Sequence, residues 1–146
     1  MLPPRALPVV RGVFAVYLVA VALIVFLPGG DAEHVTGVLV FLARALEAAE
    51  GIGIPFDVGY TIIEFTANIA LFAPFGLLLG LLAPLWPSWL VIASGFAMSA
   101  GIEFIQTMLP TRYSTVSDVI ANTLGTAIGI VVLRVWSRRR DHTVSR

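Results

Sequence analysis

Four long apolar stretches, separated by proline and glycine, constrain this chain more than any other feature. They cover about residues 9–27, 60–83, 88–108 and 117–136. A helix needs about 20 consecutive apolar residues to cross the hydrocarbon core of a bilayer. The breaks between the stretches carry residues that end helical hydrogen bonding, namely Pro28, Gly29, Pro84, Pro87 and Pro110. The sequence therefore predicts one all-α membrane domain over residues 1–146, an integral membrane bundle of about four transmembrane helices.

The overall composition narrows the class of protein further. Hydrophobic residues make up 58% of the chain and charged residues 12%, which is about half the charge of an ordinary soluble domain. The formal net charge is zero, so we expect no nucleic-acid partner. There is no cysteine, and the two histidines, His34 and His142, lie outside the apolar stretches. We therefore expect no disulfide, no metal site and no cofactor.

The uncharged part of the first stretch, Val13 to Leu27, also resembles the apolar region of a signal peptide, because Arg5 and Arg11 precede it. It is longer than the apolar region of a signal peptide. Pro28, Gly29 and Gly30 follow it in place of a small-x-small cleavage site. We expect an uncleaved transmembrane helix.

Residues 31–50 differ from the four stretches because they mix apolar and charged positions. Apolar residues recur there at spacings of three and four, while the charges fall mostly on the other side of the helical wheel. This pattern is typical of an amphipathic helix lying at the membrane interface. A short fifth span is the alternative, and its charges argue against it.

Arginine placement predicts the orientation. With four spans, seven arginines lie on one side: Arg5, Arg11, Arg134, Arg138, Arg139, Arg140 and Arg146. Only Arg44 and Arg112 lie on the other side. Because positive residues concentrate on the cytoplasmic side, we expect both termini in the cytoplasm, with a basic tail at residues 137–146. The loop at residues 28–59 is then outside.

Polar residues inside the apolar stretches are the main functional signal. Such groups are costly in a membrane and need a reason to be there. They form three pairs, each on one helix face: Glu64 with Asn68, Glu103 with Gln106, and Asp118 with Asn122. In the predicted topology all six lie in the outer half of the membrane, from the interface to roughly 12 Å deep. Arg112 stands in the loop beside them.

Two interpretations of this polar layer remain open. In the first, the groups only satisfy one another, with Arg112 paired to a carboxylate. In the second, they form a pocket open to the outer leaflet. Three carboxylates against one arginine leave excess negative charge, which a protonated glutamate, a cation or a cationic ligand would balance.

Small residues predict close helix packing. Gly76 with Gly80, Ala97 with Gly101, and Gly125 with Gly129 form small-xxx-small pairs. Such pairs let helix backbones approach closely in lipid, and an oligomer contact is the alternative use. Pro74 removes one backbone hydrogen bond and predicts a kink in the second span.

The ordered set of these motifs resembles the VanZ-like family of membrane proteins. Residues 64–76 carry an N-x-x-x-F-x-P-x-G pattern, Glu103 and Gln106 an E-x-x-Q pattern, and residues 122–125 an N-T-x-G pattern, with Arg112 and Asp118 between them. The resemblance covers about residues 60–130. One departure is that Thr115, Val116 and Ser117 stand where relatives often carry further acids.

The resemblance implies a bacterial inner-membrane protein and an association with teicoplanin resistance, without supplying a reaction. We therefore expect a membrane lipid partner and a site that binds a lipid-linked cell-wall precursor or a lipophilic glycopeptide. The alternative is an enzyme acting on an outer-leaflet lipid or cell-wall intermediate through buried carboxylates. A transporter or channel fits less well, since the inner half is apolar. A structural or partner-binding role is also compatible.

Overall fold

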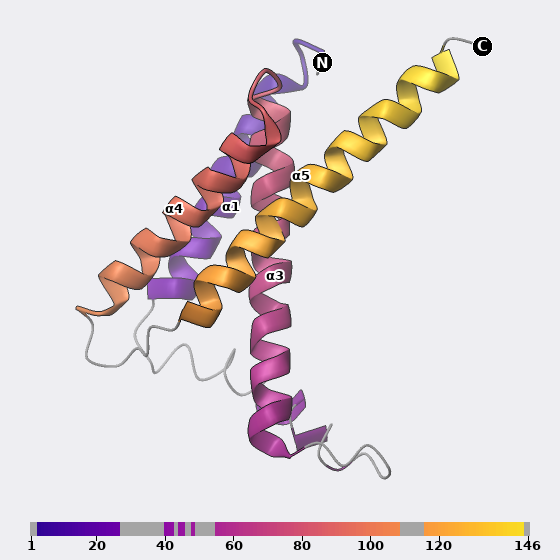
Figure 1. The fold of residues 1–146 in the computed structure, drawn as a ribbon. Helices are drawn as coiled ribbons and strands as arrows, with labels where there is room; N and C mark the ends of the chain where they lie inside the picture. Colours follow the sequence, from indigo (N-terminus) through magenta and orange to yellow (C-terminus); the bar gives the residue numbers. More distant parts are fainter. Residues whose placement is uncertain are drawn as a thin grey trace.

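The computed structural model describes residues 3–26, 40–42, 44, 45, 48, 55–108 and 116–144, with side chains up to residue 139. Four long helices account for most of these residues (Figure 1): α1 Leu7–Phe26, α3 Phe56–Leu82, α4 Ser88–Gln106 and α5 Val116–Val144. Each is long and apolar enough to cross a membrane, α5 through its portion Val116–Arg139. No strand occurs in the described residues. The predicted all-α membrane bundle is confirmed.

Helix ends follow the local sequence. Pro55 and Pro87 directly precede α3 and α4, where a missing N–H costs nothing because the first turn has no partner for it. The Ala83 N–H closes α3 by bonding to the Leu79 carbonyl at 2.8 Å. At its far end, α5 continues through the basic tail, since arginine is a good helix former outside the membrane as well. Of the predicted interfacial helix at residues 31–50, positions 40–42, 44, 45 and 48 are described and helical, and the rest lies outside the described residues.

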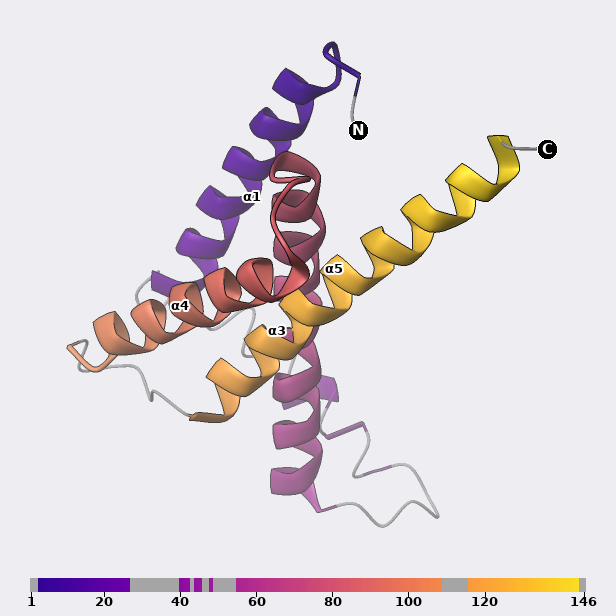
Figure 2. The same cartoon turned by 45° about the horizontal axis from the view of Figure 1, so that its top comes forward.

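The helices alternate in direction. Asn68 of α3 contacts Asp118 of α5, and further along both helices Gly80 lies against Ile130. Because residue numbers increase in the same direction along this contact, α3 and α5 are parallel. Helix α4 runs against α5, and α1 runs against α3 (Figures 1 and 2). Both chain ends lie at the same end of the bundle (Figure 1), which we call the terminal end; the opposite end is the distal end.

The closest helix contact joins α3 and α5 through glycines. A methyl group added at Gly125 would overlap the Ile69 carbonyl, and one at Gly129 would overlap the Ala73 carbonyl. A methyl at Gly76 would likewise meet the Thr126 carbonyl. Gly76, Gly125 and Gly129 therefore let these backbones approach closely, whereas Gly80 faces the side chains of Ile130 and Leu133. At Gly101 an added methyl would meet nothing within 4 Å, so the pair of Ala97 with Gly101 is not used between the described helices.

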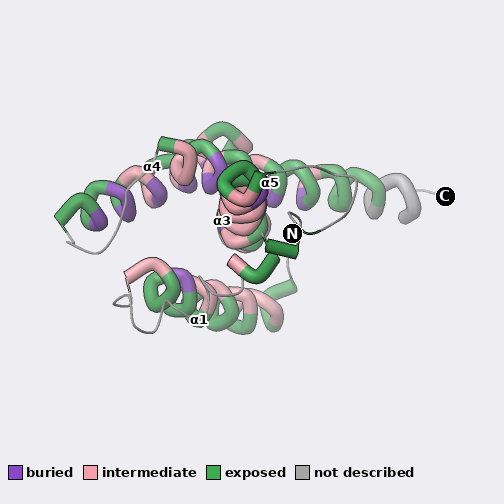
Figure 3. Tube along the Cα trace, turned by 90° about the horizontal axis from the view of Figure 1, so that it is seen from below, coloured by how far each residue is buried: buried purple, intermediate pink, exposed green. Residues whose placement is uncertain are grey.

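Two apolar clusters fill the rest of the interior. One joins α1, α3 and α4 around Val21, Phe72, Phe75 and Ile102, and the other joins α4 and α5 around Val91, Ile130 and Leu133. Elsewhere the helices present large apolar side chains outward, and the outer face of α1 is largely exposed (Figure 3). Exposed apolar surface of this extent suits contact with lipid rather than with water.

Tyr17 joins α1 to α3 beside the proline of α3. Pro74 has no N–H to offer the Ala70 carbonyl. One position further on, the Tyr17 hydroxyl donates to the Leu71 carbonyl at 2.7 Å. A side chain of α1 thus bonds to the main chain of α3 within one turn of Pro74.

Candidate polar site at the distal end

A buried hydrogen bond between α4 and α5 forms the inner limit of the site. Asn122 is 5% exposed, and its Nδ2 donates to Ser99 Oγ at 2.9 Å. Its Oδ1 is buried and has no hydrogen-bond partner among the described residues. Thr126, fully buried one turn further along α5, donates to the Asn122 carbonyl at 3.0 Å and lies against Gly95. The helix backbones are therefore close enough here to exclude larger side chains.

A second hydrogen bond joins α3 to α5 nearer the distal end. Asn68 Nδ2 donates to Asp118 Oδ1 at 2.6 Å. Both side chains are half-buried. A short bond from an amide to a carboxylate is among the stronger neutral-to-charged contacts. This bond holds Asp118 at the junction of the two helices.

Two further α3 side chains stand near the same carboxylate. Glu64, one turn before Asn68, interacts electrostatically with Asp118, and so does Tyr60 one turn earlier still. Glu64 is half-buried. Helix α3 therefore lines the distal end with a polar face over about two turns.

Glu103 adds a third carboxylate from α4. It is 8% exposed, well below what is usual for an acidic side chain. Helices α4 and α5 are antiparallel, and Ser99 bonds to Asn122. Glu103 lies one turn beyond Ser99 on α4, and Asp118 lies one turn beyond Asn122 on α5, both toward the distal end. The two carboxylates therefore stand at the same level of the bundle.

Gln106 connects the site to α1. It is 8% exposed, and its Nε2 donates to the Val25 carbonyl at 3.2 Å, near the end of α1. The carbonyls of the last helical turn have no partner within their own helix. Gln106 satisfies one of them, so all four helices contribute to the polar distal end.

The structure thus brings together residues of three helices that the sequence placed at one depth. Asn68, Asp118, Asn122 and Glu103 lie around the junction of α3, α4 and α5, Glu64 lies at its edge, and Gln106 turns toward α1. Arg112 lies outside the described residues.

Two buried residues of the site were not singled out from the sequence. Ser99 precedes Glu103 by one turn, and Thr126 follows Asn122 by one turn, each on the same helix face. This one-turn spacing from Glu103 and from Asn122 is the sequence feature that would have predicted their place in the site. Small hydroxyl residues in apolar helices commonly bond to their own backbone, so the residue type alone does not indicate a functional side chain.

The site offers hydrogen-bond acceptors and negative charge in a largely apolar setting. Three carboxylates and three side-chain amides are gathered within it. Among the described residues, no group of three or more His, Cys, Asp and Glu side chains is arranged to hold a metal ion. The arrangement suits a ligand that supplies hydroxyl, amide or amine donors.

Fold and site together define a multi-pass, all-α membrane protein with a polar site buried between its helices at one end. The family described as VanZ/LLP1 matches residues 14–137, a range that spans most of the chain and all of the polar residues above. The chain belongs to the VanZ/LLP1 family, which confirms the resemblance found in the sequence. Comparison with curated proteins finds no match. Comparison with solved structures finds none either.

Proposed function

We propose that the distal polar site binds the polar part of an amphipathic ligand in the outer leaflet of a bacterial inner membrane. The ligand class is a lipid-linked cell-wall precursor or a lipophilic glycopeptide, and the effect is protection of the teicoplanin type. The carrying observation is the buried Asn122 amide, whose Oδ1 lacks a hydrogen-bond partner among the described residues at a level where α3, α4 and α5 all present polar groups.

The energetics of burial support a ligand or water at this place. A buried carbonyl oxygen without a donor costs about 1–3 kcal/mol, so a water molecule or a ligand group is expected to bond to it. A hydroxyl or amine entering between α4 and α5 would satisfy Asn122 and meet Glu103 and Asp118 on the way. Sugars and peptides carry these donors in quantity.

The apolar flanks support an amphipathic ligand over a water-soluble one. Large side chains such as Phe104 and Ile120, on the lipid-facing sides of α4 and α5, are 64% and 50% exposed beside the polar residues. The acyl chain of a glycopeptide gains roughly 0.8 kcal/mol for each methylene that leaves water on entering this region. A prenyl chain already in the bilayer gains close packing against these side chains instead. Arg112, in the loop between α4 and α5, would hold a phosphate or carboxylate, which its planar guanidinium suits.

Drug susceptibility of a Gram-positive host that overproduces the protein tests the proposal. We expect reduced susceptibility to teicoplanin, which carries a fatty acyl chain, and a smaller change for vancomycin. Asp118→Asn should abolish the effect at matched membrane levels. Asp57→Asn is the control, because it removes an equal charge at an exposed position in the first turn of α3. Unchanged teicoplanin susceptibility with confirmed production would contradict the proposal.

Arg112 provides an independent arm of the same assay. Arg112→Lys keeps the charge but loses the two-pronged geometry, so it should impair protection nearly as much as Arg112→Ala if an oxyanion is held there. Equal protection by Arg112→Ala and the unaltered protein would remove Arg112 from the site.

Incubating purified protein with labelled lipid-linked precursors separates binding from turnover. We expect the precursor to be retained without chemical change. Conversion to a new product, lost in Glu103→Gln, would instead support the enzymatic alternative in which a buried carboxyl acts as general acid or base.

A further inference from the structure

A second polar feature lies at the terminal end, far from the site above. There, α5 and the start of α4 line an open pocket, called the hollow below, of about 590 Å³. Its lining combines two arginines and two serines with two valines, namely Arg134, Arg138, Ser88, Ser137, Val131 and Val135. Strong positive charge and apolar surface thus meet in one concave place.

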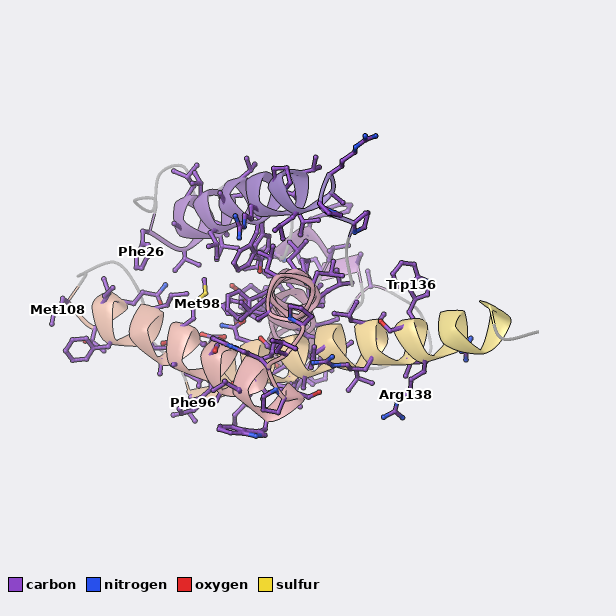
Figure 4. All side chains as sticks on the ribbon, turned by 90° about the horizontal axis from the view of Figure 1, so that it is seen from above. Phe26, Phe96, Met98, Met108, Trp136 and Arg138 are labelled. Atoms are coloured by element: carbon purple, nitrogen blue, oxygen red, sulfur yellow. The ribbon has the colours of Figure 1, made fainter. Side chains whose placement is uncertain are left out.

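The two arginines are one turn apart on α5 and therefore share a face. Arg134 Nη2 donates to the Trp86 carbonyl in the α3–α4 connection at 2.7 Å, which fixes this guanidinium beside the hollow. A guanidinium has five N–H donors, so this bond leaves others for a ligand. Arg138 and Trp136 extend from opposite sides of α5 (Figure 4). Arg134 is thus held by its bond to Trp86, and Arg138 lines the same hollow.

The start of α4 adds backbone donors at the same place. Pro87 precedes the helix and makes no side-chain hydrogen bond to its first turn. Ser88, the first residue of α4, lines the hollow. The first N–H groups of a helix attract anions because they lack partners within the helix. They reinforce the positive charge that the two arginines supply.

Tryptophans place this hollow at the membrane surface. Trp86, Trp89 and Trp136 are 41%, 67% and 49% exposed and surround the terminal end of α4 and α5. Tryptophan side chains concentrate at the level of lipid headgroups. The hollow is therefore at headgroup depth, with Val131 and Val135 continuing from it along the lipid-facing side of α5.

We propose that this hollow binds an anionic phospholipid of the leaflet at the terminal end. Arg134, Arg138 and the first turn of α4 hold the phosphate, and Val131 and Val135 contact the first methylenes of an acyl chain. Free inorganic phosphate shares the headgroup chemistry but has no use for the valines. A headgroup seated here would connect the start of α4 to α5.

Lipid titration of the purified full chain tests this site. Detergent-solubilised protein is stripped of lipid, given phosphatidylglycerol or phosphatidylcholine, and examined by native mass spectrometry. We expect preferential retention of phosphatidylglycerol and a loss of at least about fivefold in its affinity for Arg138→Gln. Arg139→Gln is the matched control, because it removes the same charge from the neighbouring residue, which does not line the hollow. It should retain the lipid.

Each other outcome overturns the proposal. Equal losses in Arg138→Gln and Arg139→Gln would mean general attraction of lipid to a basic tail. No loss in either variant would mean that the hollow does not hold the headgroup. Competition by inorganic phosphate at concentrations similar to those of the lipid would make this a free-anion site. Unfolding midpoints of the two variants, measured in lipid-free detergent, establish that a difference in binding does not arise from misfolding.

Discussion

At the residue scale, single hydroxyl groups join the helices. Ser99 is fully buried on α4 and accepts the hydrogen bond of the Asn122 amide. Ser99→Ala should lower the free energy of unfolding in detergent by about 0.6–1.7 kcal/mol, the range for hydrogen bonds between membrane helices. Ser94→Ala is the control, because Ser94 bonds only to the Leu90 carbonyl of its own helix. Equal effects of the two substitutions would argue that the link between α4 and α5 contributes nothing.

Tyr17 offers a second test at this scale. Tyr17→Phe keeps the ring, which stacks on Phe14 with centroids 6.2 Å apart, and removes only the hydroxyl that donates to the Leu71 carbonyl of α3. We expect a loss of about 1 kcal/mol in unfolding free energy. Unfolding in detergent measures this loss. An unchanged free energy of unfolding would show that the hydrogen bond between α1 and α3 contributes nothing.

At the scale of helices, the parallel pair of α3 and α5 organises the bundle. Gly125→Ala should destabilise the protein by about 1–3 kcal/mol, because the new methyl would overlap the Ile69 carbonyl and force the backbones apart. Gly101→Ala adds the same methyl into open space, so it should be neutral or stabilising by up to about 1 kcal/mol through helix propensity alone. Thermal unfolding in detergent measures both variants. Opposite signs of the change in unfolding free energy would distinguish the effect of helix packing from that of helix propensity. Destabilisation by Gly101→Ala would instead indicate a contact with another molecule.

At the scale of the whole molecule, the four candidate spans of the described residues predict both chain ends on one side of the membrane. The excess of arginine at the terminal end predicts that this side is the cytoplasm. Because the chain has no cysteine, single-cysteine labelling can test the orientation. An impermeant reagent added to intact cells should label Gly29→Cys and leave Asp141→Cys unlabelled until the membrane is opened. The reverse pattern would invert the topology and move the polar site to the inner leaflet.

Much of the fold and part of the candidate site were predictable from sequence. Four spans follow from four apolar stretches of about 20 residues, because a helix of that length crosses the bilayer with all its backbone hydrogen bonds made internally. The depth of the polar layer follows from position along each helix, and hence the shared level of Asn68, Glu103 and Asp118 was anticipated. The partners of these residues were not. The partners depend on how each helix is rotated about its own axis. Because these helices are apolar on nearly every side, hydropathy alone does not determine that rotation.

The sequence by itself determined that this is a membrane protein of four helices, with polar groups at one depth and arginines at the opposite end. Those properties depend on residue type and on position along a helix, and both can be read from a single chain. Only the tertiary structure decided that Asn68 bonds to Asp118, that Ser99 receives Asn122, and that Gly76 and Gly125 face a neighbour while Gly101 does not. Such pairings depend on which faces meet, and in lipid that choice is made by close backbone contact and side-chain hydrogen bonds rather than by hydrophobicity.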